Sequence, residues 1–167
     1  MLQKTMTNNA TIQGILFDLD GTLLDSIHGL HNTTNTLLQD ANLPPVTLDY
    51  LRGHVDKGAQ EIIAHSFKIK LNDPSIKPLQ KKFLKHYLNT MCEYTEYFAG
   101  VSTMLNYLQE NNIPWGIVTN RPHFLVQPII KKFNFDTYPG CMVYGDTLSE
   151  AKPSPAPLSH ASQTLKL

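Results

Sequence analysis

An apolar run that ends in two carboxylates stands near the beginning of the chain, where residues 12–23 read IQGILFDLDGTL. Residues 12–18 have the length and composition of a buried strand. Asp18 and Asp20 follow this strand, and Gly21 permits the tight turn that brings both carboxylates to one centre. An Asp-Gly pair alone indicates only a solvated turn. The complete hexamer DLDGTL (18–23), placed after a strand, favours a catalytic site instead. In such a site one carboxylate is the nucleophile and the other acts as acid and base.

The rest of the chain predicts helices and two further strands. Apolar spacing predicts a helix from residue 27 with Ser26 as its N-cap, then helical stretches over 48–67 and 79–91, with nothing strand-like between 26 and 98. Helices and strands then alternate, and the last helix takes Ser154 as N-cap: helix 101–108, strand 114–119, helix 124–133, strand 141–146 and a helix from 154. Strands separated by helices predict right-handed crossovers and a parallel sheet, the α/β class.

Composition narrows the class of partner. The 167 residues include 14 Lys and Arg and 14 Asp and Glu, so the net charge is zero. One domain with this balance lacks the basic surplus that binds nucleic acid or acidic membranes, which leaves small molecules as the expected partners. The two cysteines form no metal-binding pattern, and no signal peptide or apolar span of about 18 residues occurs. We therefore expect a reduced, cytoplasmic protein that is neither secreted nor anchored.

Three motifs, in this order, resemble those of the haloacid dehalogenase-like (HAD) hydrolase superfamily, in particular its phosphoglycolate phosphatase-like members. FDLDGTLLDS at 17–26 resembles the first motif, Thr119 in VTNR occupies the place of the second, and Lys152-Pro153 that of the third. The resemblance implies a Rossmannoid parallel sheet with a helical cap inserted after the first strand. Residues 12–26 and 99–167 would then form the α/β core, and residues 27–98 the cap.

The resemblance also implies a role for each motif residue. Asp18 would attack phosphorus to form an aspartyl-phosphate, and Asp20 would protonate the leaving alkoxide and then activate water. Thr119 and backbone amides near Asn120 would hold the phosphoryl oxygens. Lys152 and a Mg²⁺ ion held by Asp18 and Asp20 would offset the transition-state charge. Taken singly, Thr119 is typical of any strand end and Lys152 of any surface.

Two arginines are candidates for substrate binding. Arg52 begins the segment RGHVDKG (52–58), which resembles the cap loop that touches substrate in phosphoglycolate phosphatase-like members. The same segment fits an interhelical turn with glycine C-caps equally well. Arg121 offers a fork for a phosphate or a substrate carboxylate, and it fits an exposed loop arginine equally well.

The sequence departs from the family pattern at the fourth motif, an acidic pair that follows the third motif. The chain ends at Leu167, before the place where that pair is expected, so we expect a core that is incomplete at its C-terminal side and binds Mg²⁺ poorly. Residues 145–150 (GDTLSE) copy the acidic spacing but precede Lys152. Asp146 and Glu150 are therefore given no metal role.

The motifs together predict a Mg²⁺-dependent phosphatase for a small phosphorylated metabolite resembling phosphoglycolate. An N-acetylmuramic acid 6-phosphate phosphatase is one alternative, because the cap and the TNRP segment (119–122) resemble such enzymes as well. A β-phosphoglucomutase-like enzyme, which shares the first motif, is another. A catalytically inactive domain that only binds phosphorylated ligands is the alternative of another class, and the absent fourth motif is the reason to keep it. The sequence gives no indication of the oligomeric state.

Overall fold

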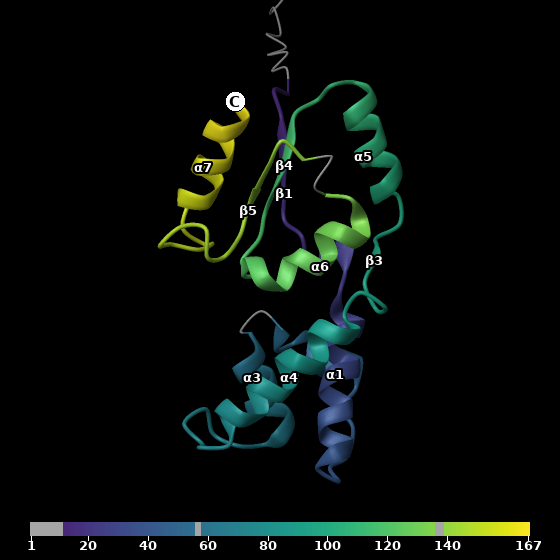
Figure 1. Ribbon diagram of the computed structural model, residues 1–167, viewed down its shortest axis with the longest axis vertical. Coiled ribbons are helices and arrows are strands. Elements are labelled where there is room, and N and C mark those ends of the chain that lie inside the picture. Colours follow the sequence, from purple (N-terminus) through teal and green to yellow (C-terminus); the bar gives the residue numbers. More distant parts are fainter. Residues whose placement is uncertain (1–11, 56–57, 136–138) are drawn as a thin grey trace, which may run out of the picture.

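The computed structural model describes residues 12–55, 58–135 and 139–167, which form two stacked units (Figure 1). The lower, helical unit contains α1 (Ile27–Asp40), α2 (Leu48–Arg52), α3 (Ala59–Phe67) and α4 (Ile76–Thr90). The upper, α/β unit contains strands β1 (Ile15–Phe17), β4 (Trp115–Val118) and β5 (Cys141–Val143) and helices α5 (Val101–Glu110), α6 (His123–Phe133) and α7 (Ala156–Leu165). None of the helices in these described ranges is both long and apolar enough to cross a membrane.

The three strands of the α/β unit form a parallel sheet in the order β1-β4-β5. Ile15 lies opposite Trp115, and Val118 lies opposite Val143. The predicted α/β class with a parallel sheet is therefore confirmed. Each strand is shorter than the apolar run that predicted it: β1 and β4 lack residues at both ends of their runs, and β5 lacks the end of its run, where the chain turns.

Side-chain alternation along β4 separates two layers of helices. Trp115 and Ile117 are buried in the main apolar cluster together with residues of α5 and α6. Val118 instead joins Val143 and Ala161 of α7 in a second cluster. Because successive side chains of a strand point to opposite faces, the sheet is covered on both sides, with α7 on one side and α5 on the other (Figure 1).

A two-stranded ribbon joins the units. β2 (Leu24–Asp25) pairs antiparallel with β3 (Glu96–Tyr97), so the chain enters and leaves the helical unit through adjacent segments. The prediction that nothing strand-like lies between residues 26 and 98 is therefore wrong at β3. A strand of two residues carries no periodic signal, and its partner lies more than 70 positions away in the sequence.

Local chemistry explains the other differences in helix boundaries. The predicted stretch 48–67 is divided into α2 and α3, because Gly53 ends α2 and Gly58, at a φ of +85°, precedes α3. α4 begins at Ile76 instead of residue 79, since Pro78 is tolerated in a first helical turn. α7 begins at Ala156, whose N–H donates to the Ser154 hydroxyl over 3.2 Å.

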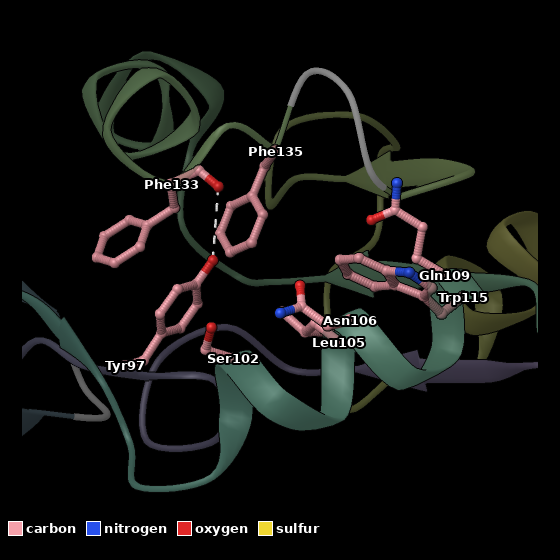
Figure 2. A pocket seen from close by; sticks show the side chains of 8 residues that line it. All are labelled: Tyr97, Ser102, Leu105, Asn106, Gln109, Trp115, Phe133 and Phe135. Atoms are coloured by element: carbon pink, nitrogen blue, oxygen red, sulfur yellow. Dashed lines mark hydrogen bonds between the residues drawn. The ribbon is translucent and has the colours of Figure 1, made fainter. Parts of the chain in front are cut away.

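A cavity of about 170 Å³ lies beside Trp115, the first residue of β4 (Figure 2). Aromatic rings from β3, β4 and the end of α6 surround it, and the Tyr97 hydroxyl donates to the carbonyl of Phe133 over 3.5 Å. Its lining consists of Tyr97, Ser102, Leu105, Asn106, Gln109, Trp115, Phe133 and Phe135. None of the residues predicted for catalysis lines this cavity, since they follow the carboxyl ends of the strands.

Candidate active site

The predicted catalytic residues meet at the carboxyl edge of the parallel sheet. Asp18 follows β1 directly, Thr119 follows β4 directly, and Lys152 lies in the connection between β5 and α7. Parallel strands end at the same edge of a sheet, which is where α/β proteins bind ligands. The topology β1-β4-β5 therefore brings Asp18 close to Thr119 and Lys152, which follow it in the sequence by about 100 and about 130 positions.

Asp18 and Lys152 form an ion pair at this edge. The Lys152 Nζ lies 2.8 Å from Asp18 Oδ1 and donates to the carbonyl of Val118 over 2.7 Å. The backbone N–H of Leu19 donates to the same Oδ1 over 2.7 Å. Oδ2 of Asp18 has no hydrogen-bond partner among the described residues. Because 46% of the Asp18 side chain is exposed, this carboxylate is fixed in orientation and open to a ligand.

Asp20 is held by one of its oxygens. Its Oδ1 accepts hydrogen bonds from the Ser26 hydroxyl and, over 2.6 Å, from Arg121 Nη2. Within the described residues its Oδ2 accepts none. Ser26 stands at the predicted N-cap position of α1, but its hydroxyl makes no capping bond. Its αR backbone conformation differs from the extended one of most N-caps, and its hydroxyl donates to Asp20 Oδ1 instead.

The loop after β4 combines a buried hydroxyl with a clamp on Lys152. Thr119 is 3% exposed, and its Oγ1 accepts from the backbone N–H of Arg121 over 3.1 Å. The Asn120 side chain donates to the Lys152 carbonyl and accepts from the Lys152 N–H, each over 2.9 Å. The Asn120 side chain thus positions Lys152. The backbone N–H of Asn120 is left as the group that can contact phosphate. This clamp is a tertiary contact between two loops, so no local signal predicts it.

The two candidate arginines have different surroundings. Arg121 is 9% exposed, and its Nη2 donates both to Asp20 and, over 2.9 Å, to the Tyr87 hydroxyl of α4. Apolar spacing marks Tyr87 only as a core position, so sequence reasoning missed this contact. Arg52 is the last residue of α2 and is exposed, and its side chain makes no hydrogen bond or ion pair within the described ranges. The structure therefore brings Arg121, and not Arg52, to the Asp20 carboxylate.

Charge and burial set the protonation states of Arg121 and Tyr87. Burial acts to lower the pKa of Arg121, but the neighbouring Tyr87 and Asp20 outweigh it and the pKa is raised. Burial has the opposite effect on the Tyr87 phenol, whose pKa it raises. Arg121 is therefore a permanent cation at this edge of the sheet, and Tyr87 stays a neutral phenol near pH 7.

The acidic residues of the 145–150 segment are occupied elsewhere. Asp146 Oδ1 accepts from the backbone N–H of His123, the first residue of α6, over 2.9 Å. Glu150 accepts from the Ser154 hydroxyl. In the described parts of the chain, no three His, Cys, Asp or Glu side chains gather to hold a metal ion. The carboxylates and carbonyls of Asp18 and Asp20 are still hard oxygen donors of the type that Mg²⁺ takes, and Mg²⁺ is usually bound by one or two carboxylates together with substrate phosphate.

Gly145, which follows β5, lies against the loop that carries Thr119 and Asn120. A Cβ at Gly145 would lie 2.1 Å from the carbonyl oxygen of Asn120. Gly145→Ala should therefore displace this loop, lowering the free energy of unfolding by about 1–3 kcal/mol and lowering catalytic activity with it. Urea unfolding measures the first effect and phosphate release the second. Gly53→Ala is the matched control, because its Cβ would lie 3.6 Å from the Tyr50 carbonyl oxygen. Equal free energies of unfolding for the two variants would contradict the close approach of Gly145 to the Asn120 carbonyl oxygen.

The chain is similar to known phosphatases over most of its length. The profile of the family described as Haloacid dehalogenase-like hydrolase matches residues 15–167. The phosphoglycolate phosphatase of Xanthomonas campestris pv. campestris (strain 8004) is 38% identical over 153 residues, which are 92% of this chain and 69% of that protein. The N-acetylmuramic acid 6-phosphate phosphatase of Pseudomonas aeruginosa PAO1 is 30% identical over 154 residues, 92% of this chain and 68% of that protein.

The fold is also similar to that of a solved structure. The crystal structure of a predicted phosphoglycolate phosphatase from Haemophilus somnus 129PT superposes with a TM-score of 0.80 at 28% sequence identity, over 93% of this chain and 72% of that one. Because this superposition includes nearly all of this chain, the similarity extends to the α/β unit and the helical unit together.

Proposed function

The chain belongs to the haloacid dehalogenase-like hydrolase family, and we propose that it hydrolyses a phosphoglycolate-like metabolite through an aspartyl-phosphate on Asp18. It is a phosphoric monoester hydrolase, as its phosphatase relatives indicate. The observation that carries the proposal is the ion pair between Asp18 and Lys152 beside Asp20, at the edge of the sheet. Asp18 supplies the nucleophile, Lys152 a fixed positive charge and Asp20 the acid, all within one site.

The first half-reaction transfers the phosphoryl group to the protein. A carboxylate oxygen of Asp18 forms a bond to phosphorus as the bond between phosphorus and the ester oxygen breaks. Asp20 gives its proton to the departing alkoxide through Oδ2, which makes no hydrogen bond with any described residue. Lys152, the Thr119 hydroxyl and the Asn120 backbone N–H stabilise the negative charge on the phosphoryl oxygens.

The second half-reaction restores the free protein. Asp20, now ionised, accepts a proton from a water molecule whose oxygen attacks phosphorus. The bond between phosphorus and the Asp18 oxygen breaks, which releases inorganic phosphate and returns Asp18 to its carboxylate form. Asp20 then holds the proton needed for the next turnover, so no further proton donor is required.

Mg²⁺ would be held by the Asp18 carboxylate and the Asp20 backbone carbonyl, together with substrate phosphate and water. When bound, it would offset the negative charge of the phosphoryl group. Two protein oxygens form a sparse site, so we expect weak binding that substrate strengthens.

The helical unit is the proposed cap of this site. It is joined to the α/β unit through the β2–β3 ribbon, and its α4 contacts Arg121 through Tyr87. A cap over the carboxylates would exclude water during phosphoryl transfer and select the alcohol part of the substrate.

Phosphate release from a substrate panel tests the function. With Mg²⁺ present, we expect kcat/KM to be highest for phosphoglycolate, and chelation of the metal should stop release. Higher kcat/KM for N-acetylmuramic acid 6-phosphate, the substrate of the Pseudomonas relative, would favour that alternative. Isomerisation of β-glucose 1-phosphate without net release would indicate a mutase. A folded chain that binds these esters and releases no phosphate from any of them would contradict the proposed activity.

A further inference from the structure

A single nitrogen atom connects helix α4 to the proposed acid–base residue. Arg121 Nη2 donates to Tyr87 Oη over 2.9 Å and to Asp20 Oδ1 over 2.6 Å. Tyr87 belongs to the helical unit, whereas Asp20 and Arg121 belong to the loops that follow β1 and β4. The contact therefore crosses between the two units at the active site.

Tyr87 is fixed firmly enough to hold the guanidinium in place. It is 2% exposed, its ring is stacked on Phe83 with centroids 6.2 Å apart, and the Arg121 Cζ lies 5.6 Å from the centroid of the Tyr87 ring. Burial raises the pKa of the phenol, which therefore stays neutral and accepts a hydrogen bond from the cation without competing for its charge. Arg121 Nη1 is buried and has no hydrogen-bond partner among the described residues, so the described hydrogen bonds of this guanidinium come from Nη2.

The same contact links the orientation of Asp20 to the position of α4. Ser26, the other donor to Oδ1, lies only six residues from Asp20 on the same segment of the chain. Arg121 is the donor that comes from elsewhere in the α/β unit. Loss of the Tyr87 contact would free Nη2 to shift, and the Asp20 carboxylate would lose its external support.

We infer that Tyr87 is a positioning residue that acts through Arg121 to orient Asp20 for protonation of the leaving group. The inference rests on the proposed function, because it assumes that Asp20 acts as the general acid. Tyr87 itself need not touch the substrate. In this arrangement the acid is oriented when α4 is seated against the α/β unit.

Dependence on the leaving group distinguishes positioning from a structural role. Phosphoglycolate releases a strongly basic alkoxide that needs a proton, whereas p-nitrophenyl phosphate releases a weakly basic phenolate that does not. Tyr87→Phe keeps the ring and removes only the hydroxyl. We expect kcat/KM to fall about tenfold for phosphoglycolate and less than threefold for p-nitrophenyl phosphate, since general acid catalysis as a whole contributes about 10²–10⁴-fold.

Two further variants complete the design. Tyr107→Phe is the matched control, because Tyr107 is an exposed residue of α5, and it should change neither kcat/KM value. In an Asp20→Asn background, Tyr87→Phe should have no further effect on phosphoglycolate, because two residues that act through one group are not additive. Circular dichroism establishes that every variant is folded, and Arg121→Lys, which keeps the charge without the fork, should repeat the substrate-dependent loss.

Equal losses for the two substrates, no loss for either, or full additivity with Asp20→Asn would overturn the role of Tyr87 and leave the proposed function standing. No turnover of either ester by the unmodified chain would overturn both.

Discussion

Asp18→Asn is expected to lower phosphate release by at least about 10⁴-fold, to the background rate, because removing a catalytic nucleophile costs that much or more. An amide is a poor nucleophile at phosphorus. Its oxygen can still accept from the Leu19 N–H and from Lys152 Nζ, the two contacts that hold Asp18 Oδ1. The variant should therefore keep the native fold while losing the reaction.

Phosphate release with saturating phosphoglycolate and Mg²⁺ measures this effect, with circular dichroism as the test of folding. Asp40→Asn is the matched control, since Asp40 is exposed at the far end of α1. It carries the same substitution away from the site and should retain full activity. A folded Asp18→Asn variant with more than about one hundredth of the native rate would contradict the assignment of Asp18 as nucleophile.

Asp20→Asn is expected to lower kcat/KM for phosphoglycolate by about 10²–10⁴-fold, the usual contribution of general acid catalysis. The amide oxygen can replace Oδ1 and keep the contacts with Ser26 and Arg121. The amide nitrogen then occupies the place of Oδ2 and can neither give up nor accept the required proton. With p-nitrophenyl phosphate the first half-reaction should be nearly unaffected and the second should be slow.

Rapid-mixing absorbance measurements test this asymmetry. Asp20→Asn should release one equivalent of p-nitrophenol per protein in a burst, followed by a slow steady state, because water attack on the aspartyl-phosphate lacks its base. The native chain, assayed in parallel, should show no such accumulation if its second step is fast. A uniform loss with both esters and no burst would mean that Asp20 does not act as acid and base.

Much of the α/β unit could be predicted because its signals are local. The apolar runs before Asp18 and before Thr119 form neighbouring parallel strands. The run predicted at 141–146 contributes β5, which pairs with the strand before Thr119. Once these strands are parallel, Asp18 and Thr119 must share an edge. Lys152 reaches this edge because its backbone is clamped by Asn120.

The contacts that could not be predicted are those between distant segments. Tyr87 has the spacing of an ordinary core residue, and only the packing of α4 against Arg121 gives its hydroxyl a role. From the sequence, Arg121 fits substrate binding and an exposed loop position equally well. Only the structure shows that its guanidinium contacts Asp20. Strand β3 is too short for a period of its own, so it forms only because Leu24 and Tyr97 pair.

The covalent intermediate is the feature that separates this mechanism from direct attack by water. The Asp20→Asn variant, mixed with p-nitrophenyl phosphate and Mg²⁺, quenched in acid and digested, should yield a peptide that carries one phosphoryl group on Asp18, detected by mass spectrometry. The same treatment of the double variant with Asp18→Asn should yield none. Phosphate release with no phosphorylated peptide, or with the phosphoryl group on another residue, would contradict the aspartyl-phosphate mechanism.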